Sequence, residues 1–183
     1  MKTIIITGKQ CCGKRTLANH IAYSLKFQHV YKVAVTDETD LFGQIDSYYY
    51  SEVQNEVFDD DIGDVVFVAG TQKELLGSYG FEKSAFEDGD YVITAMPSQL
   101  ESIFEFLGSE NCVVIYLNVL NKLERRHRAI GEGDFRNLPY WTRETDESAQ
   151  FEDLQFDLEL DNKDKDTSKV ITQIQSFIKN NGG

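Results

Sequence analysis

The sequence contains very little proline: its two proline residues, Pro97 and Pro139, are far apart. This scarcity excludes a proline-rich linker, and we also find no internal repeat and no low-complexity tract. The 183 residues are 41% hydrophobic and 12% aromatic, which is enough apolar material to bury a substantial core. We therefore expect one globular domain, with room for a lid or an inserted region.

Positive charge is also scarce, because 18 Lys and Arg residues stand against 31 Asp and Glu residues and give a formal net charge of −13. Nucleic acids and anionic membranes are polyanions that most of this surface would repel, so we expect neither as a partner. No apolar stretch approaches the roughly 20 residues that a membrane span needs. A nucleotide would therefore have to enter a locally positive pocket.

Only three cysteines are present, and their spacing fits neither a zinc site nor a disulfide framework. No signal-peptide pattern precedes the first apolar run, and together these features predict a cytoplasmic protein. Cys11 and Cys12 are adjacent, and two interpretations of them stay open. They are redox-sensitive thiols near a helix N-terminus, or they simply fill variable positions of a loop.

The most specific motif is the segment 8–16, Gly-Lys-Gln-Cys-Cys-Gly-Lys-Arg-Thr, which follows the apolar run 3–7 and opens the helical pattern 16–27. Glycines at this spacing let the backbone turn tightly and aim N–H groups inward, while the following helix adds its positive N-terminal end. Lys14 then reaches the outer phosphates of a nucleotide, and the motif predicts an ATP phosphate site. The candidate contacts are Gly8, Cys11, Cys12, Gly13, Lys14, Arg15 and Thr16.

One position departs from the usual phosphate-loop pattern. Ser or Thr normally follows the lysine and its hydroxyl ligates Mg²⁺, but here Arg15 follows Lys14 and the hydroxyl comes one residue later, at Thr16. Thr16 is therefore the candidate for Mg²⁺ ligation, or it bonds a phosphate oxygen from the first helical turn. Arg15 either adds positive charge at the phosphates or points to solvent.

Apolar and amphipathic segments alternate along the chain, which predicts an α/β layered fold with a mostly parallel sheet covered on both faces. In such a sheet, ligands bind at the carboxyl ends of the strands. The expected strands are 3–7, 29–35, 65–69, 91–95, 112–117 and 156–160. The expected helices are 16–27, 51–58, 98–107, 120–130 and a final one whose apolar residues run from Val170 to Ile178.

Three further segments carry a family resemblance together with the motif. Residues 45–51, Ile-Asp-Ser-Tyr-Tyr-Tyr-Ser, are similar to a Val-Asp-Tyr-x-Phe-x-Ser segment, and residues 75–79 fall where Tyr-Tyr-Gly-Thr-Ser or a relative is found. Arginines between positions 123 and 143 fall where a lid supplies them. Over nearly its whole length the chain resembles the guanylate kinase family of nucleoside monophosphate kinases. The resemblance implies a single domain, 1–183, with a three-layer P-loop kinase fold, a monophosphate-binding region at about 36–82 and a lid at about 122–147.

The resemblance also implies ATP-dependent phosphoryl transfer to a nucleoside monophosphate, with Mg²⁺, by a monomer or homodimer. The implied catalytic residues are Lys14, Arg125, Arg126, Arg136 and Arg143. The implied substrate-binding residues are Tyr48, Tyr49, Ser78 and Tyr79. Alternatively, the arginines form a solvated helix face paired with Glu124 or Glu132, and the tyrosines pack the small region.

The acceptor site departs from the family pattern. The family grips the acceptor phosphate with two arginines after the second strand, whereas residues 35–40 here contain no arginine and three carboxylates. Carboxylates that read guanine are also missing near Val66, Thr94 and Met96. Three hypotheses follow: a monophosphate kinase with an altered acceptor, a noncatalytic binding module on the same fold, and a P-loop kinase for a small non-nucleotide metabolite.

Overall fold

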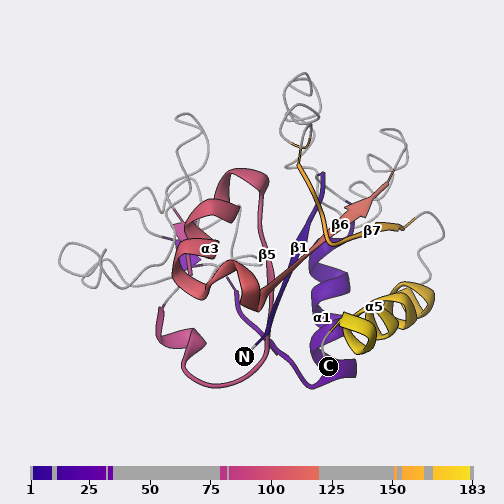
Figure 1. Ribbon diagram of the computed structural model, residues 1–183, viewed down its shortest axis with the longest axis horizontal. Coiled ribbons are helices and arrows are strands. Elements are labelled where there is room, and N and C mark those ends of the chain that lie inside the picture. Colours follow the sequence, from indigo (N-terminus) through magenta and orange to yellow (C-terminus); the bar gives the residue numbers. More distant parts are fainter. Residues whose placement is uncertain are drawn as a thin grey trace.

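The computed structural model has a five-stranded parallel sheet at its centre (Figure 1). The structure describes residues 2–9, 12–31, 33–34, 79–81, 83–119, 151, 154–162 and 167–181. The strands lie in the order β2-β5-β1-β6-β7. Their bounds are Thr3–Thr7 for β1, Gln28–His29 for β2, Tyr91–Thr94 for β5, Cys112–Asn118 for β6 and Leu158–Asp161 for β7.

Strand β1 lies in the middle of this sheet, between β5 and β6. Thr3 is in register with Tyr91 on one side and with Cys112 on the other. All five residues of β1 are buried, which explains why the sequence there is an apolar run bounded by threonines. Because the strands are parallel, the carboxyl ends of β1, β5 and β6 meet at one edge of the sheet, where the candidate phosphate loop begins.

Helices cover both faces of the sheet and make three layers (Figure 1). Helices α1 (Lys14–Leu25) and α5 (Thr167–Asn181) pack on one face, and α3 (Leu100–Leu107) packs on the other. Alternate residues of β1 serve the two faces: Ile4 and Ile6 join the core under α1 and α5, and Ile5 joins the core under α3. The predicted three-layer α/β fold is therefore confirmed.

The predicted helices 16–27 and 98–107 are present with shifted ends. Helix α1 begins at Lys14 and ends at Leu25, where Lys26 takes a left-handed φ of 63° and stops it. At the second site, residues Pro97–Gln99 form a 3₁₀ turn, η4, before α3 begins. The Gln99 side chain closes this turn by accepting a 2.8 Å hydrogen bond from the Met96 backbone N–H.

The prediction of one strand over residues 29–35 is wrong. Gln28–His29 is β2 and pairs in parallel with β5, but Val33–Ala34 is a separate strand, β3. Strand β3 pairs antiparallel with β4 (Tyr79–Gly80) in a two-stranded sheet of its own. The break arises because the two halves of the apolar segment bond to different partners, so the chain leaves the large sheet between them.

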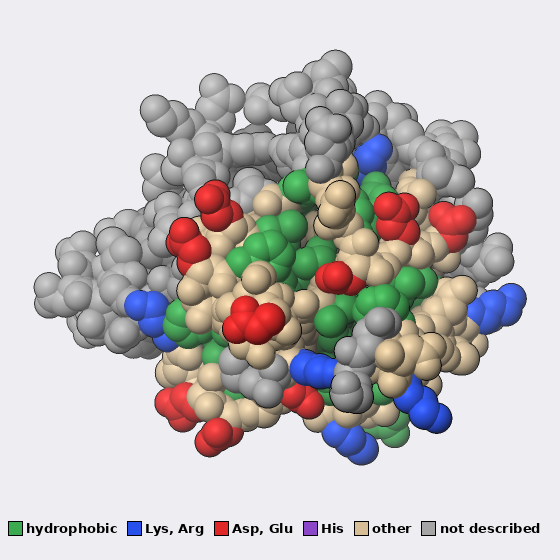
Figure 2. Space-filling view, in the orientation of Figure 1, with side chains coloured by type: hydrophobic (Ala, Val, Ile, Leu, Met, Phe, Trp, Pro, Cys, Tyr) green, Lys and Arg blue, Asp and Glu red, His purple; other side chains and the backbone are tan. Residues whose placement is uncertain are grey.

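The other described strands agree with the sequence to within about two residues at each end, and two short 3₁₀ turns, η3 (Lys83–Phe86) and η5 (Ser109–Asn111), complete the described elements. The predicted elements 51–58, 65–69 and 120–130 lie outside the described residues, as do the lid at 122–147 and most of the region 36–82. Figure 2 shows Asp and Glu side chains spread over one face, in line with the net charge of −13. Among the described helices, none has the length and apolar character to cross a membrane.

Candidate phosphate-binding site

The candidate loop connects β1 to α1 and lies against the end of β6. Gly8 opens the loop with a φ of 149°. A Cβ atom at this position would lie 2.5 Å from the Leu117 carbonyl oxygen and 2.8 Å from Cys12 Sγ. Only a residue without a side chain lets the backbone pass this close to β6, so the first glycine of the motif has a steric cause.

Gly13 closes the loop at the N-terminus of α1. Its φ of 96° is left-handed, and a Cβ atom there would lie 2.9 Å from Asn162 Nδ2. The Gly13 carbonyl accepts the first helical hydrogen bond, from Leu17 N at 2.9 Å. The early N–H groups of α1 have no partners within the helix, and with the helix dipole they make this end a favourable place for an anion.

The Lys14 side chain folds back over the loop. Its Nζ donates hydrogen bonds to the carbonyl oxygens of Gly8 at 2.7 Å and Lys9 at 2.9 Å, and it lies 4.0 Å from Cys12 Sγ. The loop is thus closed around its own ammonium group. A mobile ammonium held beside a helix N-terminus can move to phosphate oxygens without a change in the backbone.

Cys12 is a buried member of the core under α1 and α5. Its backbone N–H donates to the Lys9 carbonyl at 3.4 Å, and its thiol fills the space beneath Gly8. Of the two interpretations of the vicinal cysteines, this burial favours the packing role for Cys12, while Cys11 lies outside the described residues.

The third cysteine, Cys112, lies at the start of β6. Burial, followed by the charges of Glu110 and Asp157, raises the pKa of the Cys112 thiol to about 11.

Arg15 lies over the Tyr31 ring, just beyond β2. Its guanidinium carbon lies 5.9 Å from the centre of the Tyr31 ring, within cation–π range. The sequence left two positions open for this side chain, at the phosphates or in solvent, and the aromatic contact was not anticipated. Tyr31 directly follows Val30, which extends the pairing of β2 with β5 through a 3.1 Å bond to Val92. Arg15 therefore brings positive charge to the carboxyl end of β2.

A polar cluster fixes the residues around Arg15. Asn19 Oδ1 lies 2.6 Å from His29 Nδ1 and accepts a 2.9 Å hydrogen bond from the Tyr31 hydroxyl. The His29 and Tyr31 rings lie 4.0 Å apart. Burial, and then the charge of Arg15, lower the pKa of His29 to about 4. His29 is therefore neutral at neutral pH, with its proton on Nδ1 facing Asn19. The sequence signal for this cluster was the pair His29 and Tyr31 at the end of a strand.

Asn162 is a second residue that sequence reasoning missed. It follows β7, where it is only 7% exposed, and its Nδ2 donates a 2.9 Å hydrogen bond to the Cys12 carbonyl. The available signal was an amide residue directly after the last strand of the sheet, at the edge where parallel sheets bind ligands. It was overlooked because it opens a stretch of charged residues that predicts only a solvated turn.

The described carboxyl ends of the central strands carry hydroxyl and amide side chains rather than carboxylates: Thr7 in β1, Thr94 in β5 and Asn118 in β6. Within the described ranges, no group of three or more His, Cys, Asp or Glu residues is placed to hold a metal ion. Thr16, the candidate Mg²⁺ ligand, is exposed in the first turn of α1. Any Mg²⁺ bound here would therefore be held chiefly by groups other than carboxylates of these strands.

The structure does not place the side chains of the remaining predicted site residues. For Tyr79, it describes only the backbone, which is part of β4. The others lie outside the described residues: Cys11, Tyr48, Tyr49, Ser78, Arg125, Arg126, Arg136 and Arg143. Their roles stay predictions.

Solved structures of kinases resemble this chain, among them a guanylate kinase and a shikimate kinase. A crystal structure of guanylate kinase from Anaplasma phagocytophilum matches with a TM-score of 0.58 at 14% identity, covering 98% of this chain and 85% of that chain. A structure of shikimate kinase from Acinetobacter baumannii in complex with shikimate matches with a TM-score of 0.51 at 12% identity, covering 99% and 94%. No protein-family model matches the chain, and no curated protein matches its sequence. Likeness at this identity shows the P-loop kinase fold.

Proposed function

We propose that the protein is an ATP-dependent phosphotransferase that moves the γ-phosphoryl group of ATP to a small acceptor. The observation that carries this proposal is the Lys14 ammonium held 2.7 Å from Gly8 O and 2.9 Å from Lys9 O, at the N-terminus of helix α1. The loop thereby places a mobile cation beside oriented N–H groups. These are the parts that bind the phosphates of a nucleoside triphosphate.

Phosphoryl transfer requires little covalent chemistry from the protein, because positioning of the reactants and neutralisation of charge account for most of the catalysis. Lys14 would exchange its two loop carbonyls for β- and γ-phosphate oxygens, and backbone N–H groups from Gly8 to Thr16 would hold the β-phosphate. Thr16 is the candidate protein ligand for Mg²⁺, which would supply neutralisation of phosphate charge. Arginines of the lid region would close over the transferred group: Arg125, Arg126, Arg136 and Arg143.

For the acceptor, we propose a nucleoside monophosphate. The fold likeness to a guanylate kinase supports this choice, as does the resemblance of segment 45–51, with Tyr48 and Tyr49 as candidate contacts together with Ser78 and Tyr79. GMP itself is disfavoured, because residues 35–40 offer carboxylates in place of the arginine pair that would hold its phosphate.

A small hydroxylated metabolite is the second candidate acceptor. Two observations favour it: the fold likeness to a shikimate kinase, and the carboxylates Asp37, Glu38 and Asp40 in the segment that the family resemblance assigns to the acceptor phosphate. An acceptor without a phosphate needs no arginine pair. Its hydroxyl oxygen would attack the γ-phosphorus of ATP while the bond from that phosphorus to the β-phosphate oxygen breaks, so that ADP leaves and the hydroxyl proton passes to solvent.

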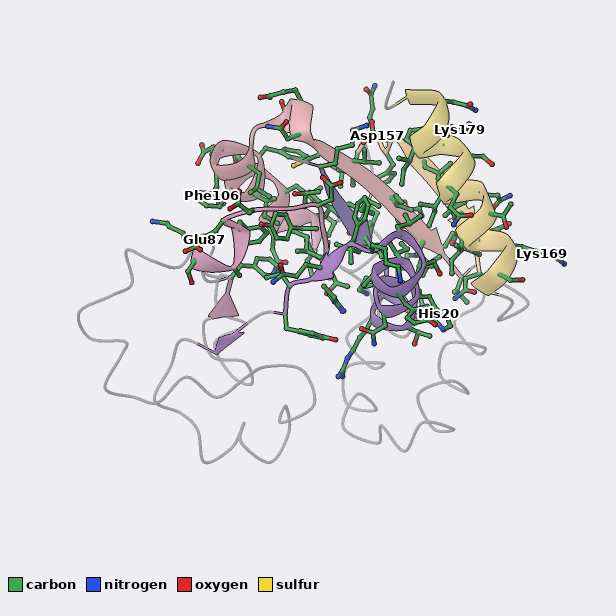
Figure 3. All side chains as sticks on the ribbon, turned by 90° about the horizontal axis from the view of Figure 1, so that it is seen from below. His20, Glu87, Phe106, Asp157, Lys169 and Lys179 are labelled. Carbon is green, nitrogen blue, oxygen red and sulfur yellow. The ribbon has the colours of Figure 1, made fainter. Side chains whose placement is uncertain are left out.

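Turnover of ATP with defined acceptors tests the proposal. Purified protein is assayed with each common ribo- and deoxyribonucleoside monophosphate, and then with shikimate and other small hydroxylated acids. Lys14→Ala should abolish turnover, whereas Lys179→Ala should not, because Lys179 is exposed on α5 and points away from the protein (Figure 3). Turnover with metabolites alone would move the acceptor to the second candidate. A chain that binds no ATP with or without Mg²⁺ would instead be a noncatalytic binding module.

A further inference from the structure

Asn162 connects the last strand of the sheet to the phosphate loop. Its backbone N–H donates to the Asn118 carbonyl at 2.9 Å, which extends the pairing of β6 with β7 by one residue beyond Asp161. Its side chain reaches across the carboxyl edge, and Nδ2 donates to the Cys12 carbonyl at 2.9 Å. The residue is therefore anchored to the sheet by its backbone and to the loop by its side chain.

The chemistry of the Cys12 carbonyl fixes which side-chain atom faces it. A carbonyl oxygen only accepts hydrogen bonds, so the amide nitrogen of Asn162, and not its oxygen, must lie toward Cys12. In a planar trans peptide the C=O and N–H bonds point in opposite directions. A carbonyl held toward Asn162 therefore directs the N–H of Gly13, the next residue, away from Asn162 and to the opposite side of the loop.

The bond from Asn162 matters because Gly13, as a glycine, could otherwise turn its backbone N–H in other directions. Glycine tolerates many backbone conformations, and Gly13 has a left-handed φ of 96° at the start of α1. The close approach of Asn162 also depends on glycine, since a Cβ atom at position 13 would lie 2.9 Å from Nδ2. The missing side chain at Gly13 and the buried amide of Asn162 therefore depend on each other.

We propose that Asn162 is a positioning residue for nucleotide binding: its side-chain amide holds the Cys12–Gly13 peptide so that the Gly13 N–H donates to a phosphate oxygen. The inference rests on the proposed binding of ATP by the loop. Asn162 itself does not touch the nucleotide. A purely structural Asn162 would stabilise the fold and leave the affinity for phosphate unchanged.

Substitution of two matched asparagines separates these roles. Asn162→Leu removes the donor with little change in size, and Asn111→Leu removes a side-chain donor that bonds the Leu107 carbonyl at 2.8 Å, at the end of α3. Dissociation constants are measured for ATP and for inorganic tripolyphosphate, both with Mg²⁺. We expect Asn162→Leu to weaken both probes by roughly ten- to a hundredfold, the factor that one hydrogen bond to a charged group contributes. Tripolyphosphate has no base, so a parallel loss assigns the effect to the phosphates. Asn111→Leu should leave both constants unchanged.

Amide NMR follows the Gly13 N–H directly, and its wild-type measurement does not depend on a variant that folds. In the wild-type chain, tripolyphosphate should shift the Gly13 amide proton strongly downfield, and in Asn162→Ala the shift at saturation should be smaller. Wild-type binding without a Gly13 shift would overturn the inference, and so would equal dissociation constants for wild type and Asn162→Leu. Both results leave the proposed function intact. A wild-type chain that binds neither probe would overturn the proposed function and this inference together.

Discussion

The ammonium of Lys14 donates a 2.7 Å hydrogen bond to the carbonyl oxygen of Gly8, six residues earlier, and so closes the candidate phosphate loop on itself. The second bond, to the Lys9 carbonyl at 2.9 Å, holds the same group from the next peptide. Two carbonyl oxygens at these distances make a compact binding position for an ammonium ion. We therefore expect the shape of the cationic group at residue 14 to matter as well as its charge.

Lys14→Arg should lower the affinity for ATP by at least about tenfold although the positive charge is kept. A guanidinium is planar and wider than an ammonium, and it cannot occupy the position between the Gly8 and Lys9 carbonyls in the same way. Titration calorimetry with ATP and Mg²⁺ measures the change. Lys179→Arg on α5 is the control. Wild-type affinity in Lys14→Arg would show that charge alone determines binding.

Gly8→Ala should destabilise the protein by about 3 kcal/mol, because its Cβ meets a backbone oxygen at 2.5 Å and the left-handed φ adds strain. Gly89→Ala is the matched control: φ is 135° there, but the nearest atoms, on Tyr91, are 4.0 Å from the added Cβ. That variant should cost about 1 kcal/mol, from backbone strain alone. Urea unfolding of both variants measures the difference, and equal losses would contradict a steric role for Gly8.

Stability should fall as the pH is lowered from about 6.5 to about 4, in part through His29. Its pKa is lowered in the folded state from 6.5 to about 4, so the unfolded chain binds the extra proton in this window and is favoured by acid. The full shift would correspond to about 3 kcal/mol, and solvent at this partly exposed group reduces the expected effect to about 1–2 kcal/mol.

Histidine variants isolate this contribution from that of the carboxylates. His29→Gln keeps a hydrogen-bonding group but does not titrate, so its stability should decline less than that of the wild type between pH 6.5 and 4.5. His20 lies exposed on α1 (Figure 3), and His20→Gln should follow the wild-type curve. Urea midpoints at a series of pH values give the comparison. Identical pH dependence in His29→Gln and wild type would refute the assignment.

Cys112 should react with iodoacetamide at pH 8 about a hundredfold more slowly than an ordinary thiol. Its pKa is raised to about 11 by burial and by Glu110 and Asp157, which leaves correspondingly less thiolate. Peptide mapping by mass spectrometry follows labelling at this residue, with the same protein in urea as the fast reference. Equal labelling rates in the folded and unfolded chain would show that the thiol is freely accessible and unshifted.

The sequence was sufficient for the features that depend on local pattern. Thr3–Thr7 is a short apolar run with a glycine-rich motif behind it, and a strand, loop and helix follow from that order alone. The helix boundary at Lys14 was missed by two residues because Gly13 supplies the turn by its backbone angle, with no capping side chain to mark it. Hydrophobic period and motif together thus predicted the centre of the fold.

The local sequence pattern could not predict contacts between distant segments. The break between β2 and β3 depends on pairing with Tyr79–Gly80, and apolar residues on both sides of the break look alike in sequence. Arg15 was ambiguous because only the fold brings Tyr31 beneath its guanidinium. Asn162 could be noted from its place after the last strand, but its bond to the Cys12 carbonyl could not be predicted, because only the fold brings these two residues together.

The bond between Asn162 and Cys12 also sets an order of events during synthesis, because the two residues are 150 positions apart. The ribosome releases the whole Gly-Lys motif long before it translates the strand that will brace it. A ligand that binds only the finished site stabilises only the finished chain. With the ATP binding proposed above, nucleotide would favour chains that already contain Asn162 over shorter nascent ones, and truncation before Asn162 would remove the donor to the Cys12 carbonyl.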